Sequence, residues 1–153
     1  EQKALLVGIV LWHARLCGEM SGQVPILLEV KVDNDIWRWM SALKGSLRQY
    51  RGRHGVMSFD PRVARLLKTR FPKVRRGLVI RDSLSPFRRR MALWLADPHF
   101  IAVERTSLGK GWVARERERR PVYSWTIRGP QQRVQAAVHA DALIWEGDGR
   151  PGN

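Results

Sequence analysis

Two charged side chains interrupt an apolar stretch of the sequence, VPILLEVKVDND at residues 24–35. Glu29 and Lys31 are two residues apart, so in a strand both side chains would lie on the same face. A carboxylate suits a hard divalent cation, and a lysine binds phosphate as a point charge. The pair therefore predicts a site for a metal ion and a phosphate group. The structural alternative is an ion pair inside the sheet.

Short apolar, β-branched runs alternate with helical patterns along the rest of the chain. The expected strands are Ile26–Val32, Gly55–Ser58, Gly77–Ile80, Phe100–Glu104, Val122–Thr126 and Ala142–Trp145, and the expected helices begin near Asp35, Pro61, Pro86, Lys110 and Pro130. Strands that alternate with helices indicate parallel pairing, because each crossover returns the chain to the same end of the sheet.

Two α/β architectures fit this alternation, an open doubly wound sheet and a closed βα-barrel. An open sheet normally carries a glycine-rich phosphate loop after its first strand. The GKGW stretch at Gly109–Trp112 lacks the spacing of that fingerprint and of a P-loop. A closed barrel takes eight strands and about 250 residues, whereas this chain has 153 residues. The sequence therefore predicts a single α/β domain, residues 1–153, that forms part of a barrel without its first two strands.

In a βα-barrel the chemistry lies at the carboxyl ends of the strands. The polar or aromatic residues at the expected strand ends are Glu29 with Lys31, then Ser58, Glu104, and Trp125 with Thr126. We expect these side chains to line one mouth of the sheet.

Three stretches, taken in order, resemble the glycerophosphodiester phosphodiesterase family. They are LLEVKVD, GVMSFDPRVARLLKTRFPKVRRGLVI and PVYSWTIRGPQQRVQAAVHADALIWEGD. The shared features are a Glu-x-Lys strand, a Ser-Phe strand end before a helix that stops at Phe-Pro, a Trp-Thr strand end, and a closing Ala-Asp-Ala-Leu-Ile strand. The resemblance extends from about Val24 to the end of the chain, and the ordered set carries it.

This resemblance implies a TIM-barrel fold and the metal-dependent hydrolysis of glycerophosphodiesters to an alcohol and glycerol phosphate. It implies Glu29 as a ligand of a divalent Mg or Ca ion and Lys31 as the catalytic residue that faces the phosphate. Trp125 matches the tryptophan on the glycerol side of the pocket, and Ser58 and Phe59 match the family's Ser-Phe pair as substrate-binding residues. The expected partner is a small-molecule glycerophosphodiester.

The chain departs from the family pattern in its catalytic histidines. The family's first strand ends in His-Arg-Gly, and its second ends in Glu-x-Asp with another histidine in the following loop. The sequence contains no His-Arg-Gly, and no Glu-x-Asp ends an early strand. His54, His99 and His139 each stand just before an expected strand, at the opposite end of the barrel from the mouth. We therefore expect a truncated chain, equivalent to the last six βα units, that is inactive alone.

The formal net charge of +14 and the pI of about 11.4 favour an anionic partner, such as nucleic acid, an acidic membrane or a phosphorylated substrate. The alternative function is a basic module that binds nucleic acid or another anion without catalysis. The chain carries no helix-turn-helix, zinc-finger or RNP signature. Its basic runs, at residues 62–76, 88–90 and 115–120, fall on expected outer helices, where solvated charge is usual. Nucleic-acid binding is therefore not favoured.

The amino-terminal segment imitates a signal peptide, with Lys3 before the apolar run ALLVGIVLW. The chain begins at Glu1, however, and the following HARLCGE segment offers no small-residue cleavage site. An amphipathic helix is the better interpretation, with Leu5, Leu6, Ile9, Val10, His13, Leu16 and Cys17 on one face. No stretch reaches the length of a transmembrane helix. Cys17 is the single cysteine, so an internal disulfide is impossible and the redox compartment is not constrained. We expect a cytoplasmic protein.

Overall fold

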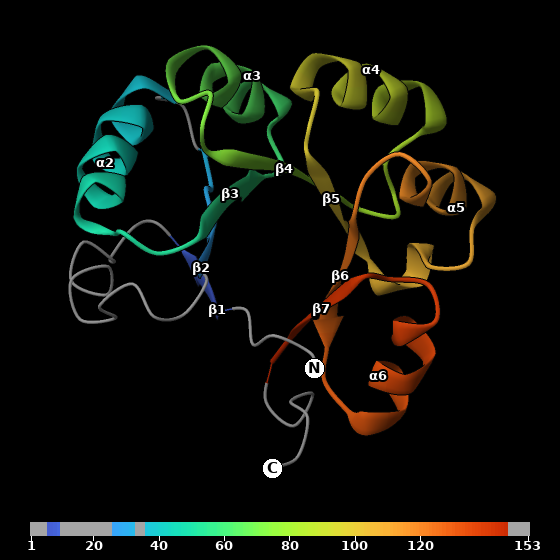
Figure 1. The fold of residues 1–153 in the computed structure, drawn as a ribbon. Helices are drawn as coiled ribbons and strands as arrows, with labels where there is room; N and C mark the ends of the chain where they lie inside the picture. The colour runs from blue at the N-terminus through green and yellow to red at the C-terminus, as the bar shows by residue number, and fades with distance from the viewer. Residues whose placement is uncertain (1–5, 10–25, 33–35, 147–153) are drawn as a thin grey trace.

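A computed structural model describes residues 6–9, 26–32 and 36–146 of the chain (Figure 1). Seven strands form one sheet in sequential order, and every neighbouring pair is parallel. The strands are β1 (Leu6–Ile9), β2 (Ile26–Glu29), β3 (His54–Ser58), β4 (Arg75–Ile80), β5 (Phe100–Glu104), β6 (Val122–Ile127) and β7 (Ala142–Trp145). The helices are α2 (Ile36–Gln49), α3 (Pro61–Arg70), α4 (Pro86–Ala96), the short 3-10 helix η1 (Arg105–Ser107), α5 (Gly111–Arg117) and α6 (Pro130–Ala137).

The sheet curls, and the helices lie on its convex side (Figure 1). The predicted α/β fold, a partial TIM-like barrel, is therefore confirmed, and all six expected strands are present in sequential order. The helix starts at Pro61, Pro86 and Pro130 are confirmed, α5 begins at Gly111 beside the expected Lys110, and Asp35 lies outside the described residues. Proline is favourable at the first helical position because its missing N–H would have no partner there. The Asp60 carboxylate also caps α3 by accepting a hydrogen bond from the Arg62 backbone N–H over 2.9 Å.

The amino-terminal helix prediction is wrong for residues 6–9, which form strand β1. This strand pairs with β2 from Leu6 opposite Ile26 to Ile9 opposite Glu29. A short apolar run fits a buried strand as well as a helix, and here the unpaired edge of β2 decides in favour of a strand. The two edge strands of the described sheet are therefore β1 and β7. The remaining residues of the expected helix lie outside the described part of the chain.

Buried side chains fill both faces of the sheet. On the convex face they pack against the helices in three clusters, one of which includes Val56, Leu43 and Leu67. On the concave face a separate cluster contains Leu27, Met57, Val79, Phe100, Ala102 and Ile144. Gly77 makes room in this inner layer, because a Cβ atom there would lie 2.3 Å from the Phe100 ring. The inner cluster packs against Phe59 and Trp125, which lie at or near the carboxyl ends of their strands.

Among the described helices, none is both long enough and apolar enough to cross a membrane.

Candidate functional site

The carboxyl ends of the strands present one row of side chains on the concave face. Alternation along a strand places Glu29, Phe59 and Arg81 on the same face as the inner-layer residues Leu27, Met57 and Val79, two positions earlier in each case. Phe59 and Trp125 pack against that inner cluster. We call the set Glu29, Lys31, Phe59, Arg81 and Trp125 the mouth. It combines one carboxylate, two cations and two aromatic rings.

Glu29 is the half-buried carboxylate of the mouth and the last residue of β2. Burial raises the pKa of Glu29 above its ordinary value of 4.5, while the positive charges of Lys31 and Arg81 lower it by a smaller amount. Lys31 is exposed, because β2 ends before the expected Val32 and the lysine lies beyond the strand. The negative charge of Glu29 is therefore incompletely compensated by its neighbours, a state typical of functional sites.

The two aromatic rings of the mouth form a fixed wall beside Arg81. Phe59 and Trp125 meet edge to face, with ring centroids 5.6 Å apart. The guanidinium carbon of Arg81 lies 4.3 Å from the Phe59 centroid, within the range of a cation–π contact. The Trp125 Nε1–H donates a 3.0 Å hydrogen bond to the Ala102 carbonyl oxygen, which fixes the indole. These contacts hold an apolar surface and a cation side by side.

Ser58 occupies a different position from the other predicted site residues. It is buried at the end of β3, and alternation places it on the same face as Val56, toward the helices. Its Oγ donates a 2.6 Å hydrogen bond to the Val30 carbonyl oxygen and accepts a 3.1 Å bond from the Asp60 backbone N–H. Ser58 therefore ties the chain that leaves β2, just before Lys31, to the loop that enters α3.

Arg81 is a mouth residue that the sequence did not single out. The signal was present, because Arg81 directly follows the apolar strand β4 at its carboxyl end. Glu104 also ends a strand, but its Oε2 accepts a 2.9 Å hydrogen bond from the Asp82 backbone N–H. Asp82 in turn accepts hydrogen bonds from Ser107 and Lys110, which lower the pKa of Asp82. Glu104 thus belongs to a network that joins the loops after β4 and β5.

Solved structures of known proteins share this architecture. A proposed glycerophosphoryl diester phosphodiesterase from Silicibacter pomeroyi aligns over 89% of this chain with a TM-score of 0.72 and 19% sequence identity. A proposed glycerophosphodiester phosphodiesterase from Galdieria sulphuraria aligns over 90% with a TM-score of 0.73 and 16% identity. A phosphodiesterase from Oleispira antarctica, in complex with the product sn-glycerol-3-phosphate, aligns over 80% with a TM-score of 0.67 and 17% identity.

The chain has the fold of part of a glycerophosphodiester phosphodiesterase. The structural resemblance therefore agrees with the one seen in the sequence. The chain spans about half the length of these solved phosphodiesterases, 52% for the Silicibacter protein, 59% for the Galdieria protein and 51% for the Oleispira protein.

Sequence comparison gives a different and much shorter similarity. No protein-family model matches the chain. The DNA replication and repair protein RecF of Mesorhizobium japonicum is 86% identical over 28 residues, which is 18% of this chain and 7% of that protein. The RecF protein of Brucella abortus is 49% identical over 62 residues, which is 39% of this chain and 16% of that protein. Such local matches do not assign the chain to the RecF family.

The described carboxylates do not by themselves make a phosphodiesterase metal site. A Ca ion takes about six to eight oxygen ligands, and an Mg ion takes about six, usually one or two carboxylates together with waters and substrate phosphates. Within the described ranges, no group of three or more His, Cys, Asp or Glu side chains is placed to hold a metal ion. Glu29 is the one mouth carboxylate, since Glu104 and Asp82 are engaged with protein donors. The residues at hand thus offer a single candidate ligand.

The three described histidines lie at the amino ends of strands, as the sequence predicts. His54 begins β3 and its Nδ1 lies 2.9 Å from the Gly52 carbonyl oxygen. His99 precedes β5 and contacts Arg76, the second residue of β4. His139 precedes β7. His13 falls outside the described residues. These positions do not bring an imidazole to the mouth.

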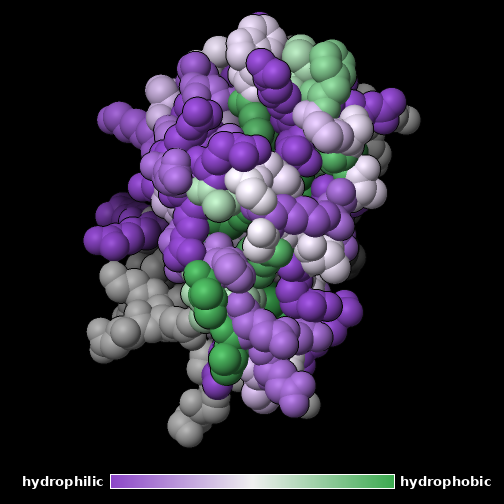
Figure 2. Space-filling view, turned by 90° about the vertical axis from the view of Figure 1, so that its right-hand side faces the viewer, coloured by the Kyte–Doolittle hydropathy of each residue, from purple (hydrophilic) through white to green (hydrophobic). Residues whose placement is uncertain are grey.

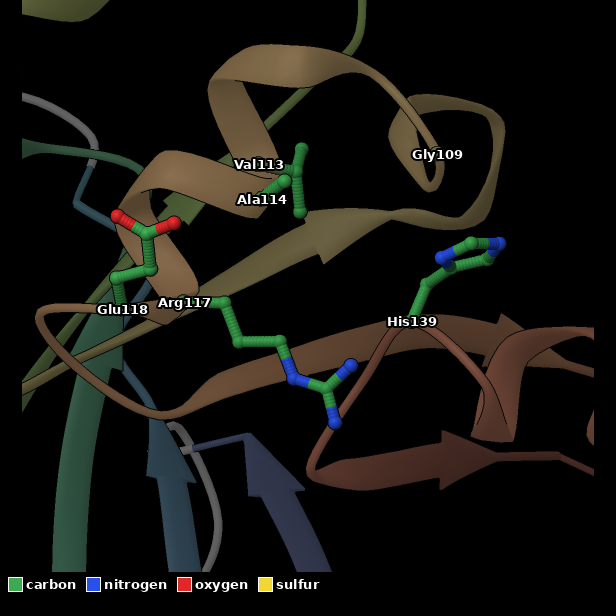
Figure 3. A pocket seen from close by; sticks show the side chains of 6 residues that line it. All are labelled: Gly109, Val113, Ala114, Arg117, Glu118 and His139. Atoms are coloured by element: carbon green, nitrogen blue, oxygen red, sulfur yellow. The ribbon is translucent and has the colours of Figure 1, made fainter.

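A pocket of about 350 Å³ lies on the outer side of the barrel, between α5 and the connection from α6 to β7 (Figure 3). Its lining residues are Gly109, Val113, Ala114, Arg117, Glu118 and His139. Arg117 is engaged there, because its side chain donates to the Val138 carbonyl oxygen over 2.8 Å and to the Asp141 carboxylate over 3.0 Å. None of the mouth residues lines this pocket, so the two places are separate.

Proposed function

We propose that the mouth forms part of the substrate site of a phosphodiesterase that hydrolyses glycerophosphodiesters to an alcohol and glycerol phosphate. The observation that carries the proposal is that Arg81 lies against the aromatic wall of Phe59 and Trp125 at the carboxyl ends of barrel strands. The half-buried Glu29 ends a strand at the same edge, where the positive charges of Lys31 and Arg81 act on it. Those strand ends carry the chemistry of βα-barrel enzymes. The shared fold with a phosphodiesterase whose product is sn-glycerol-3-phosphate supports the same substrate class.

Each mouth residue has a proposed task in this reaction. Lys31 and Arg81 contact the phosphoryl oxygens and oppose the negative charge that grows on them in the transition state. Trp125 and Phe59 present their apolar faces to the glycerol carbons. Ser58 supports substrate binding from outside the mouth, since its hydrogen bond to Val30 positions the chain next to Lys31.

Glu29 is the proposed ligand of a divalent Mg or Ca ion, which would neutralise a phosphate oxygen when bound. One carboxylate does not complete such a site, so the proposal requires ligands beyond the described residues. The proton transfers of hydrolysis also require groups beyond them, because the described histidines lie at the amino ends of the strands. The sequence also lacks the His-Arg-Gly motif that the family resemblance implies for catalysis, so we propose that the chain by itself does not hydrolyse glycerophosphocholine.

The alternative function, an anion-binding or nucleic-acid-binding module without catalysis, is supported by the net charge of +14. The short similarity to RecF, a DNA replication and repair protein, points in the same direction. This alternative predicts binding of phosphate through charge alone, with no dependence on the aromatic wall.

The proposal is tested by calorimetric titration of the chain with sn-glycerol 3-phosphate. Lys31→Met and Arg81→Met should each weaken binding about tenfold or more, because a charge-assisted contact to phosphate is worth about 1.5–3 kcal/mol. Lys44→Met is the matched control, since Lys44 is an exposed lysine on α2. Equal binding by all four proteins would contradict the proposed site. Equal binding of inorganic phosphate and sn-glycerol 3-phosphate, unaffected by Trp125→Leu, would favour the anion-binding alternative.

The metal proposal has its own test in the same titration. Mg or Ca should strengthen the binding of sn-glycerol 3-phosphate to the original chain and have a smaller effect on Glu29→Gln, which lacks the charged ligand. Removing the metal with a chelator should reverse the gain. An identical metal effect in both proteins would show that Glu29 is not a ligand.

A further inference from the structure

Helix α4 exposes large apolar side chains along one face. Phe87 is 74% exposed, Met91 is 47% exposed and Trp94 is 73% exposed. Their spacing of four and then three residues puts all three on one stripe of the helix. Figure 2 shows hydrophobic side chains at the surface near the top of the face that carries α4, among hydrophilic residues. Exposed apolar groups of this size and arrangement mark an interaction surface.

Arginines border this stripe on both sides. At 3.6 residues per turn, Arg88 and Arg90 lie on opposite flanks of the stripe, and both are exposed. Arg89 points the other way, with its guanidinium carbon 4.2 Å from the centroid of the Trp112 ring on α5. The helix therefore packs on the barrel through one side and presents an apolar stripe between two cations on the other.

The stripe lies away from both edges of the sheet and from the mouth. Helix α4 connects β4 to β5, in the middle of the sheet, whereas the two edges of the described sheet are β1 and β7. It lies on the convex side, away from the concave face that carries the mouth (Figure 1). Further exposed arginines stand on the helices that α4 contacts, Arg65 on α3 and Arg115 on α5.

We propose that α4 docks the protein onto an anionic lipid surface. The aromatic and methionine side chains enter the boundary between headgroups and acyl chains, and Arg88 and Arg90 reach the lipid phosphates on either side. A helix with an apolar face bordered by cations lies in the plane of such an interface, and its binding grows with both buried apolar area and anionic lipid. Charge complementarity with the +14 chain selects this partner over a neutral apolar one.

A second exposed apolar pair, at α6, allows the contribution of the α4 arginines Arg88 and Arg90 to be tested. Val134 on α6 and Val138, the residue directly after this helix, are each 66% exposed and lie one turn apart. Gln131 and Gln135 border Val134, and Arg117 near Val138 is already paired with Asp141. This pair has the apolar character of the α4 stripe without an exposed arginine of its own helix on each flank, so it serves as a control surface in the same chain.

The test is flotation of the full 153-residue chain with vesicles. One set is phosphatidylcholine alone, and the other is phosphatidylcholine mixed with phosphatidylglycerol. The chain should float with the mixed vesicles and less with the neutral ones, and added salt should weaken binding because it screens the charges. Phe87→Gln/Trp94→Gln should weaken binding to the mixed vesicles about tenfold or more, since burial of one large apolar side chain is worth that factor. Arg88→Gln/Arg90→Gln should remove the preference for the mixed vesicles.

Two control variants make the result specific. Val134→Gln/Val138→Gln removes an equally exposed apolar pair, and Arg119→Gln/Arg128→Gln removes the same two charges from elsewhere; both should bind as the original chain does. Circular dichroism confirms that each variant keeps its helices. Full binding by Phe87→Gln/Trp94→Gln would overturn the proposal, as would equal flotation with both vesicle types. Two other results would also overturn the proposal. If the chain forms a dimer but does not bind lipid, and Phe87→Gln/Trp94→Gln removes the dimer, the stripe is a self-association surface. If the chain binds duplex DNA through Arg88 and Arg90 but does not bind vesicles, the flanking arginines bind nucleic acid.

Discussion

Charged groups lie at both ends of the barrel strands, but they are paired with one another at the amino ends and incompletely paired at the carboxyl ends. At the amino ends, the buried Arg76 side chain donates to the Asp97 backbone oxygen over 2.9 Å, to its carboxylate over 3.3 Å, and lies 3.0 Å from the His99 Nε2. Lys68 adds a 2.7 Å ion pair to the same carboxylate, and its hydrogen bond is the main reason that the pKa of Asp97 is lowered. The charges of this amino-end cluster satisfy one another.

At the carboxyl ends, the charged side chains of the mouth are not paired with one another. Burial raises the pKa of Glu29, and Lys31 and Arg81 offset that effect in part. Among residues with described positions, no cation forms an ion pair with Glu29 within 4.0 Å. Perturbed and incompletely paired carboxylates cluster at functional sites, and Glu29 shows this pattern, whereas the charges of the amino-end cluster all have partners. The difference is what directs the functional proposal to the mouth.

The largest expected effect breaks the amino-end cluster. Arg76→Met should lower the free energy of unfolding by about 3 kcal/mol, because it removes hydrogen bonds from a buried guanidinium and leaves the Asp97 carbonyl and His99 without that donor. It should leave the binding of sn-glycerol 3-phosphate unchanged. Urea unfolding measures the first quantity and calorimetry the second. Arg75→Met, at an exposed neighbouring position, is the control. If Arg76→Met lost ligand binding but kept its stability, the amino-end cluster would have a binding role and the two ends would not differ in function.

A smaller loss should follow from Gly77→Ala, which disturbs the inner layer beneath the mouth. The added Cβ would lie 2.3 Å from the Phe100 ring, which stacks on Tyr123 with centroids 4.8 Å apart. Overpacking of this kind costs about 1–3 kcal/mol. Thermal unfolding should show the loss, and Gly45→Ala, where the added atom meets open space, should show none. An unchanged melting temperature for Gly77→Ala would mean that the inner layer is loosely packed.

The smallest expected change is a gain in stability from Glu29→Gln. The pKa of Glu29 is higher in the folded chain than in the unfolded chain, so the folded state binds more protons and stability falls as the pH rises from about 4.5. The neutral glutamine avoids that loss. Glu29→Gln should therefore be more stable than the original chain near neutral pH and nearly equal to it below pH 4.5, in melts at both values. Destabilisation near neutral pH would mean that the ionised Glu29 is well paired after all.

Much of the fold was predictable because local signals and tertiary packing agree. The apolar β-branched runs and the prolines at Pro61, Pro86 and Pro130 fixed strands and helix starts that the structure confirms. The exception is β1, where a short apolar run fits a helical stripe as well as it fits a strand. Pairing with β2 decides its conformation, and such a long-range contact leaves no trace in the local pattern.

The mouth was predictable in part for a similar reason. Glu29 and Lys31 stand out because charge is rare within an apolar run. Arg81 does not stand out in a chain with 28 lysines and arginines, and its place over Phe59 becomes visible when the strands are aligned side by side. The backbone role of Ser58 likewise depends on Val30, which is 28 positions away in the sequence. The contacts between strands, rather than the residue types, show which of these side chains belong to the mouth and which hold the backbone in place.

The pKa of Glu29 decides whether the mouth binds a phosphate, and carbon NMR of the Glu29 carboxyl group measures it with and without sn-glycerol 3-phosphate. In the free chain this pKa should lie above the ordinary 4.5. With the ligand the pKa should rise further, because a bound phosphate adds negative charge and neutralises Lys31 and Arg81. A pKa of Glu29 at or below 4.5 that does not move when the ligand is added would show that Glu29 does not face a phosphate site.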